Sequence, residues 1–457
     1  MCACYRVANG KDWGMARPRL VAVAPAFLAA AALAGDARAA TEPRFSAPVE
    51  AFVGRHPFRL VAADLNADGK PDLATADNGA GVSVMLGNGD GSLRPRAAYQ
   101  TSAKPADIAA ADLSGDGKPE LITASVDHGG SVTVLLNDGA GRFRRGEDYP
   151  SGATAPAVAT ADVNGDGLLD VLTANLGRSD LVVLLGLGDG RLGAVHAVSG
   201  GDGAVDLDVG DLNGDGRVDV ALATAHHGDA VTVRLGNGDG TFGPKRAYKA
   251  GADPDGVALA DLNHDGKLDL TVTNAEGGSV SVFLGVGDGT FGAESRHRMT
   301  RVPEAVVVAD FNADGHPDIA TSSISWAPAV AIGRGDGTFR KGRTIDWLYA
   351  QGAAAADFNL DGRPDLAFTA PDTPEATVYL NWTGLPAPPC VALDFKDERL
   401  PSAKRYVREG GCRVGRVRHS FSRSVRKNRA IGPRPAIGSV LPPRSRVDIV
   451  MSRGRRH

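Results

Sequence analysis

The amino-acid sequence predicts an all-β protein, a seven-bladed β-propeller of four-stranded blades, followed by a small α+β C-terminal domain. Three observations support this prediction. One acidic loop motif occurs seven times at a nearly constant spacing, each repeat carries the signals of four short strands, and the two ends of the array complement each other. Four short strands in ~40–50 residues are typical of one propeller blade.

The repeated motif reads Asp-x-Asn-x-Asp-Gly-x-x-Asp in most of its copies. Its first Asp lies at positions 64, 112, 162, 211, 261, 310 and 357, so the steps are 48, 50, 49, 50, 49 and 47 residues. The second copy departs from the pattern, with Ser114 in place of the Asn and Glu120 in place of the last Asp. Seven copies at this spacing indicate an array of repeated structural units.

Each repeat contains the same succession of strand signals. A small apolar run precedes the loop, as at 257–260, and a second apolar run follows it, as at 72–76. An alternating segment such as 82–86 comes next, then a Gly-rich turn such as 87–91, then a final strand such as 97–100. Alternation with period two, bounded by Asp-Gly turns, predicts antiparallel hairpins.

The ends of the array indicate how the propeller closes. Residues 47–52 stand where a fourth strand stands in the other repeats, and the last repeat stops after 376–380 without a fourth strand. An N-terminal strand in the last blade would close the ring and remove its exposed sheet edges. An open solenoid is the alternative, and it would need capping repeats. We expect a closed propeller over residues 41–382.

The loop motif predicts calcium sites. Ca²⁺ takes 6–8 hard oxygen ligands, and the side chains at loop positions 1, 3, 5 and 9 would supply them, with a backbone carbonyl from position 7 and a Gly at position 6 for the sharp turn. A solvated acidic turn is the alternative for a single copy, but carboxylates gathered seven times favour a cation, up to seven Ca²⁺ in all. The flanks are strand-like, so the loop is not an EF-hand, and the second copy should be the weakest site. The predicted ligands are Asp64, Asn66, Asp68, Asp72, Asp112, Ser114, Asp116, Glu120, Asp162, Asn164, Asp166, Asp170, Asp211, Asn213, Asp215, Asp219, Asp261, Asn263, Asp265, Asp269, Asp310, Asn312, Asp314, Asp318, Asp357, Asn359, Asp361 and Asp365.

With these loops and its Gly-Asn-Gly-Asp-Gly-x-Phe turns, the array resembles the FG-GAP/VCBS repeat family, the integrin-α-like propellers. The resemblance covers residues 45–382. It implies the propeller fold and calcium binding, but not one function, because the family includes adhesion, ligand-binding and enzyme-appended propellers. We interpret the aromatic residues of the turns, Phe242, Phe291 and Phe339, as blade-packing residues.

Residues 1–40 have the features of a signal peptide. Arg17 and Arg19 precede an apolar run at 20–34, and residues 37–39 read Ala-Arg-Ala, a small-residue cleavage site. The run is shorter than the ~20 apolar residues that a membrane span needs, although a membrane or lipid anchor is the alternative. Met15 starts a better signal peptide than Met1 does. We expect a secreted protein, extracellular or associated with the cell wall.

The C-terminal part differs from the rest in charge. Residues 390–457 hold 18 Lys and Arg against 5 Asp and Glu, whereas the chain as a whole has a net charge of −4. With +3 on residues 1–40, the middle of the chain carries −20. Such asymmetry predicts different partners for the two parts. Residues 383–389 are rich in Pro and predict a linker between them.

The tail also holds Cys390 and Cys412, which either form a disulfide in an oxidising compartment or remain as free thiols. A helix is expected over 400–407 and strands over 414–417 and 447–451. The tail resembles a PASTA domain through residues 402–407, 411–415, 431–438 and 447–450. That resemblance implies a helix packed on a small sheet and contact with peptidoglycan. The basic charge also fits attachment to an anionic wall polymer or surface, and a solvated basic module is the alternative.

No catalytic motif is present, and the acidic residues of the array are assigned to the calcium loops. The adjacent His226 and His227 have no equivalent in other repeats, so we interpret them as loop residues. The sequence therefore favours a monomeric, non-catalytic binding or adhesion module, with an extracellular protein or glycan as its ligand and no nucleic-acid partner. The alternatives are an extracellular hydrolase or lyase that uses the mouth of the propeller, and a purely structural surface protein.

Overall fold

We describe the protein from a computed structural model. It describes residues 42–453 except 47, 80, 128, 152–153, 177–178, 200–202, 225–229, 346–348, 384–389, 392–395, 397–398, 401–402, 405–412, 423, 435–439 and 442–445. The predicted signal peptide, the linker after Thr383, Cys412 and the His226–His227 pair lie outside these residues. The chain divides into two compact units, one that contains Glu50–Val378 and one that combines Pro43–Val49 with the chain from Tyr379 onward.

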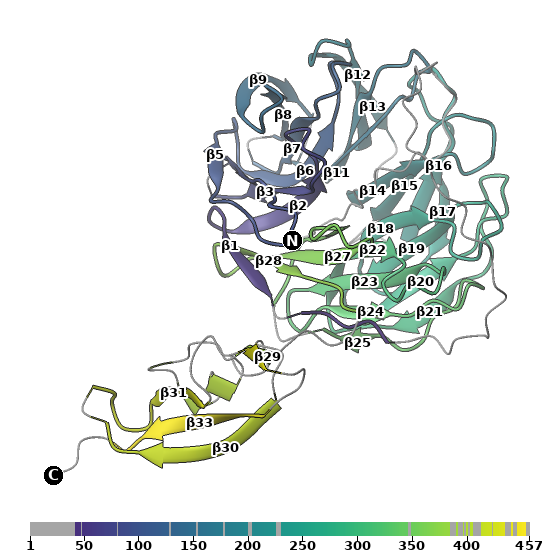
Figure 1. Ribbon diagram of the computed structural model, residues 1–457. Helices are drawn as coiled ribbons and strands as arrows, with labels where there is room; N and C mark the ends of the chain where they lie inside the picture. Colours follow the sequence, from purple (N-terminus) through teal and green to yellow (C-terminus); the bar gives the residue numbers. More distant parts are fainter. Residues whose placement is uncertain are drawn as a thin grey trace, which may run out of the picture. The chain divides into compact units, whose positions relative to one another are not determined.

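The larger unit consists of repeated antiparallel sheets. In the described residues there are seven four-stranded sheets, six of which follow chain order (Figure 1). These six are β2(Pro57–Ala63)–β3(Asp72–Asp77)–β4(Gly81–Met85)–β5(Ala97–Tyr99), β6(Pro105–Ala111)–β7(Glu120–Ser125)–β8(Ser131–Asn137)–β9(Phe143–Pro150), β10(Thr154–Ala161)–β11(Asp170–Leu176)–β12(Ser179–Gly186)–β13(Leu192–Ser199), β14(Ala204–Gly210)–β15(Asp219–Thr224)–β16(Ala230–Arg234)–β17(Arg246–Lys249), β18(Pro254–Ala260)–β19(Asp269–Asn274)–β20(Ser279–Phe283)–β21(Ser295–Arg298) and β22(Pro303–Ala309)–β23(Asp318–Ser323)–β24(Ala329–Ala331)–β25(Arg343–Thr344).

The seventh sheet joins the two ends of the array. It has the order β1(Val49–Phe52)–β28(Glu375–Tyr379)–β27(Asp365–Ala370)–β26(Ala353–Ala356). Next to this pairing, the Val53 amide donates to the Pro374 carbonyl at 2.9 Å. The first strand of this sheet, β26, contacts β2 of the first sheet. A strand from the beginning of the array therefore supplies the fourth strand of its last sheet.

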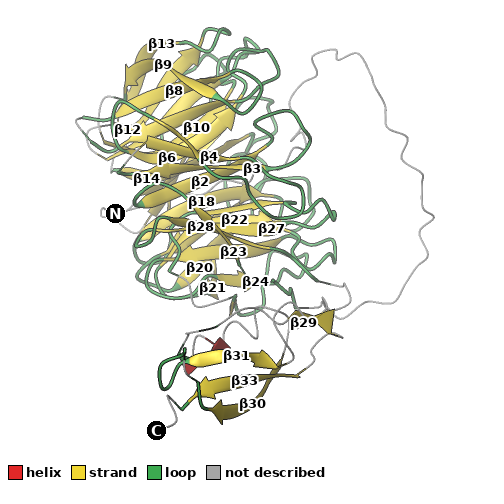
Figure 2. Cartoon of the chain, turned by 60° about the vertical axis from the view of Figure 1, so that its left-hand side comes forward, coloured by secondary structure: helices red, strands yellow, loops and turns green. Residues whose placement is uncertain are grey.

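The core of the larger unit lies between successive sheets. Leu172 and Val183 of the third sheet pack against Leu207 and Val220 of the fourth, and all four are buried. Figure 2 shows the sheets stacked in this way, face against face. Burial of β-branched and other aliphatic side chains on both faces is the main force that holds such sheets together. The prediction of an all-β chain built from repeated four-stranded sheets is confirmed.

The smaller unit contains short strands with a core of its own. β30(Arg413–Ser420) runs parallel to β33(Arg446–Ser452), which is antiparallel to β31(Ala430–Arg434), and β29(Cys390–Val391) pairs with β32(Val440–Leu441). Leu400 and the short segment Ala403–Lys404 are helical, within the expected helix at 400–407. Ala403 packs with Val447, Ile449 and Met451 in this core. The expected strands at 414–417 and 447–451 are therefore present. Because Cys412 lies outside the described residues, the disulfide stays a prediction.

Candidate metal centres

The acidic loops connect the first strand of each sheet to the second. In the first sheet Ala63 at the end of β2 pairs with Asp72 at the start of β3, so the loop closes a hairpin. The residue at loop position 9 is consequently the first residue of the second strand in every repeat. Positions 1 to 8 form the connection and positions 1, 3 and 5 are exposed or half-buried in the first loop.

Within a loop, the carboxylate at position 1 folds the backbone around itself. Asp64 Oδ2 accepts the Gly69 amide at 2.7 Å, and Asp64 Oδ1 accepts the Asp68 amide at 3.1 Å. Asn66 Oδ1 accepts the same Asp68 amide at 3.0 Å. The bond from the position 6 amide to the position 1 carboxylate recurs in all seven loops at 2.6–2.9 Å. Side chains at positions 1, 3 and 5 are thus brought together.

The glycine at position 6 is required by the backbone, as predicted. Its φ is positive in every loop, for example 79° at Gly69, where a Cβ would be disfavoured. Position 4 is also left-handed, which sequence reasoning missed. Three loops have Gly there, but Ala67, His264, Ala313 and Leu360 hold φ values between 57° and 61°. The recurrence of Gly at position 4 in three copies was the available signal.

The carboxylate at position 9 has surroundings that differ from those of the other acids. Asp72 is fully buried, its Oδ2 accepts the Leu65 amide at 2.9 Å, and its Oδ1 accepts the Gly87 amide at 2.7 Å. It therefore fastens the start of the loop and the Gly-rich turn to the second strand. A Cβ at Gly87 would lie 2.2 Å from the Pro71 carbonyl, which explains that glycine. Equivalent bonds are made by Asp170, Asp219, Asp269 and Asp318.

Burial dominates the acidity of the position 9 carboxyls. It raises the pKa of Asp72, Asp219 and Asp269 to about 6 and that of Asp318 to about 7, and repulsion by the acids at positions 1 and 5 adds to the increase. The backbone amides that these carboxylates accept act in the opposite direction. In these loops the pKa of the position 9 carboxyl is therefore set by its burial and by the groups around it.

Basic residues at position 7 neutralise part of the charge of these loops. Lys70 lies 3.1 Å from Asp68, and Lys118 lies 2.8 Å from Asp116. The fourth, fifth and seventh loops contain the same kind of pair at 3.6–4.0 Å, Arg217–Asp215, Lys267–Asp265 and Arg363–Asp361. These pairs are exposed or half-buried, and the exposed ones contribute little to stability. Leu168 occupies position 7 of the third loop, so no basic side chain balances Asp166 from that position.

His316 occupies position 7 of the sixth loop and reaches the neighbouring loop. Its Nδ1 lies 3.3 Å from Nε2 of His264, which stands at position 4 of the fifth loop, and the ring centroids are 5.4 Å apart. Because one nitrogen must accept this hydrogen bond, at least one of the two imidazoles is neutral when it forms. The pair links two acidic loops that are far apart in the sequence, and sequence reasoning missed it.

The second loop differs in the way that its sequence suggests. Ser114 donates its hydroxyl to Asp112 Oδ1 at 3.3 Å, whereas Asn at this position accepts the position 5 amide in the other loops. Glu120 still accepts the Leu113 amide at 2.9 Å, so the longer side chain fills the structural role of Asp at position 9. The sequence change therefore alters the hydrogen bonds at position 3 more than those of the buried carboxyl at position 9.

The donor set fits a hard cation such as Ca²⁺. Each loop offers carboxylate and amide oxygens, and a carboxylate oxygen that accepts one amide retains a lone pair for a cation. In the described part of the chain, however, no three His, Cys, Asp or Glu side chains already lie together as metal ligands. The side chains that would hold the cation are those at positions 1, 3, 5 and 9, because each oxygen of the position 9 carboxylate, as in Asp72, accepts only one backbone amide.

Comparison with known proteins identifies the class. The chain matches crystal structures of BBS1N in complex with ARL6DN, one at 12% and one at 11% sequence identity, each with a TM-score of 0.53 over 74% of this chain and 97% of that chain. A structure of an Agrocybe aegerita lectin that recognises non-reducing terminal N-acetylglucosamine matches at 22% identity and a TM-score of 0.47, over 71% of this chain and 85% of that chain. The likeness to BBS1N shows a β-propeller fold.

The family follows from the sequence repeats. The model of the FG-GAP-like repeat matches residues 64–123, 112–173, 162–222, 211–272, 261–321 and 310–368. The chain therefore belongs to the FG-GAP-like repeat family. A search of curated proteins gave no match. Among the described residues no helix has the length and apolar character needed to cross a membrane.

Proposed function

We propose that this chain is a calcium-binding, closed seven-bladed propeller that acts outside the cell as a non-catalytic binding module. The observation that supports it best is the bond from the position 6 amide to the position 1 carboxylate in all seven loops, each of which joins two strands of one sheet. A cation on positions 1, 3, 5 and 9 would offset the repulsion between carboxylates that the loop geometry brings together. Two observations support closure. The seventh sheet combines β1 from the beginning of the array with strands from its end, and β26 contacts β2.

Thermal unfolding of the secreted protein in Ca²⁺, in Mg²⁺ and in chelator tests this proposal. When the concentration of free Ca²⁺ is 100 times the Kd of a site, that site adds about 2.7 kcal/mol to the free energy of unfolding. The Tm should therefore rise by several degrees in Ca²⁺. Mg²⁺ should have a smaller effect, because it prefers octahedral geometry and retained water. A Tm that is the same in Ca²⁺ and in chelator would contradict calcium binding.

The third and second loops provide a matched pair of variants. The third loop combines Asn164 with Leu168, so no internal cation competes for its carboxylates, whereas the second combines Ser114 with Lys118. Asp166→Asn should therefore remove more of the calcium-dependent rise in Tm than Asp116→Asn does. In chelator the two variants should unfold at similar temperatures. Equal losses of the calcium effect would refute the ranking of the sites.

We further propose that the basic C-terminal unit, a PASTA-like domain, attaches the protein to the cell wall. Its strand β30 carries Arg416 and Arg418, although Arg418 is paired with Asp448 at 2.8 Å. Retention of the full chain on purified peptidoglycan tests this attachment. Specific contact should survive moderate salt, while complete loss at moderate salt would show a purely electrostatic association.

A further inference from the structure

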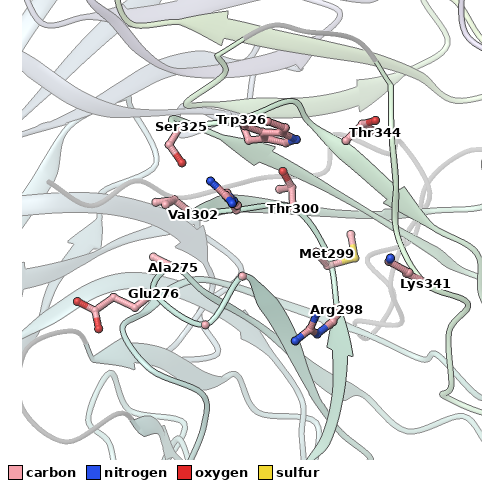
Figure 3. Close-up of a pocket in the computed structure, with 13 residues that line it drawn as sticks. Ala275, Glu276, Arg298, Met299, Thr300, Val302, Ser325, Trp326, Lys341 and Thr344 are labelled. Carbon is pink, nitrogen blue, oxygen red and sulfur yellow. The ribbon is translucent and has the colours of Figure 1, made fainter.

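A cavity of about 640 Å³ opens between the fifth and sixth sheets (Figure 3). Lys341 and Thr344 line it from the start of β25, and its other walls come from the β19–β20 connection, from the segment between β21 and β22, and from the β23–β24 connection. These connections lie at the strand ends opposite to the acidic loops, because each acidic loop joins the first and second strands of its sheet. The cavity is therefore separate from the candidate metal centres, and its volume falls within the ~300–1,000 Å³ typical of ligand sites.

The lining of the cavity is basic, although residues 41–389 as a whole are strongly acidic. Arg298, Arg301 and Lys341 contribute three cations, and among the described lining residues Glu276 is the one carboxylate. Within the described residues, no carboxylate lies within ion-pair distance of any of these cations. Figure 3 shows Glu276 at the edge of the cavity, on the side away from Lys341. Cations gathered in a concave surface attract anions.

The hydrogen bonds around the cavity hold its aromatic wall in place. The Arg301 guanidinium lies 5.3 Å from the centroid of the Trp326 ring, a cation–π arrangement. The buried Ser323 hydroxyl donates to the Arg301 carbonyl and accepts the Trp326 amide at 3.0 Å. Thr300 Oγ1 donates to the Ala327 carbonyl at 2.7 Å. A wall that is already ordered costs little conformational entropy when a ligand binds.

The cavity combines three kinds of surface. Besides its cations it has an apolar wall of Met299, Val302 and Trp326, and it has hydroxyl groups from Ser325 and Thr344. An inorganic anion would use the cations alone, and its size would leave most of the cavity unfilled. A sugar ring with a carboxylate would use all three, because its C–H face packs on apolar groups, its hydroxyls bond to hydroxyls, and its charge faces the cations.

We infer that this cavity binds an acidic saccharide, a uronate in an extracellular polymer. The inference rests on the proposed role as a binding module and assigns that role a site and a ligand class. Lys341 and Arg298 reach the cavity from different segments of the chain, and both are exposed, so they meet the carboxylate without a large desolvation cost. Recognition then depends on charge and on the apolar wall together.

The experiment is calorimetric titration of the full chain in Ca²⁺ with tetragalacturonate. Its methyl ester provides a neutral probe of the same shape, and a tetraglutamate peptide provides the same charge without sugar rings. Lys341→Gln and Arg298→Gln should each weaken tetragalacturonate binding about tenfold, the loss of one charge-assisted hydrogen bond. Lys249→Gln removes an exposed charge from β17, outside the cavity, and should leave the affinity unchanged.

Binding of tetragalacturonate that exceeds that of both other probes and falls in the two cavity variants supports the inference. Equal binding of tetraglutamate overturns the assignment of a saccharide and leaves a general anion site. No binding of tetragalacturonate, or equal losses in all three variants, overturns the site itself. The calcium-dependent rise in Tm is measured on the same samples, so a failure of this inference is distinguishable from a failure of the proposed calcium module.

Discussion

A buried carboxyl on β22 provides a sharp test of the packing around the first strands of the sheets. Glu304 is 1% exposed, and its Oε2 has no hydrogen-bond partner among the described residues. Burial in the first place, and repulsion by Asp255 of β18 in the second, raise the pKa of Glu304 to about 9. The Arg59 guanidinium from β2 and a hydrogen bond with the Gln351 side chain lower it only in part. The folded protein therefore holds Glu304 protonated at neutral pH.

The variant Glu304→Gln keeps an uncharged polar group of the same shape. Because the folded pKa lies above the unfolded value, the stability from the protonated carboxyl is complete below the unfolded pKa and is lost as pH rises toward the folded pKa. One proton changes the free energy of unfolding by about 1.4 kcal/mol per pH unit in that window. Between about pH 6 and about pH 8, the wild type should lose roughly 3 kcal/mol relative to the variant.

Urea unfolding at several pH values measures this difference. The position 9 carboxyls also titrate in this range, but they are the same in both proteins and cancel when the two free energies are subtracted. Glu50→Gln, at an exposed position on β1, is the matched control and should show no such trend. A difference between wild type and Glu304→Gln that does not change with pH would refute the reasoning, as would a variant that becomes less stable than wild type at high pH.

Three further predictions concern the loops and the ring. Asp219→Ala leaves the Leu212 and Gly236 amides without their acceptor and should cost about 2–4 kcal/mol in urea unfolding, and a loss below 1 kcal/mol would contradict the role of position 9. Ala313→Gly relieves a left-handed φ of 57° and should raise the free energy of unfolding by about 1 kcal/mol, whereas Ala320→Gly within β23 should lower it. Deletion of residues 42–52 exposes the edge of β28 and should cause association visible by light scattering, and a monomer of unchanged Tm would disprove closure by β1.

The repeated sheets could be predicted because their signals are local. The expected strands at 72–76, 82–86 and 97–100 correspond to β3, β4 and β5 within a residue or two. Likewise 376–380 corresponds to β28, and part of 47–52 to β1. Period-two alternation and Asp-Gly turns act over a few residues, and seven copies multiply the same signal. The family match over 64–368 agrees with that prediction.

The different environments of the acids within one loop could not be predicted in this way. Asp72 and Asp68 are equivalent as letters of a motif, yet Asp72 is buried in a strand and Asp68 is exposed. The difference depends on the strand register, and on a turn fifteen residues farther on whose Gly87 amide Asp72 accepts. The Arg59 guanidinium donates to the Gln351 carbonyl at 3.4 Å, a bond between residues from opposite ends of the array. No local pattern reports such a contact.

The acidic loops and the basic cavity therefore lie at opposite ends of the strands and have different proposed roles. At one end, the acidic loops join the first and second strands, and any cation that they hold would act on stability. At the other end, the basic cavity with Arg301 and Trp326 is held by Ser323, a residue of β23 that is remote from the loop before that strand. Chelation of Ca²⁺ should consequently lower the Tm. The affinity for tetragalacturonate, measured at temperatures below the unfolding transition, should be unchanged under the same conditions. A parallel loss of affinity and Tm would show instead that the loops position the cavity, and the sixth loop, which leads directly into β23, would be the connection to test first.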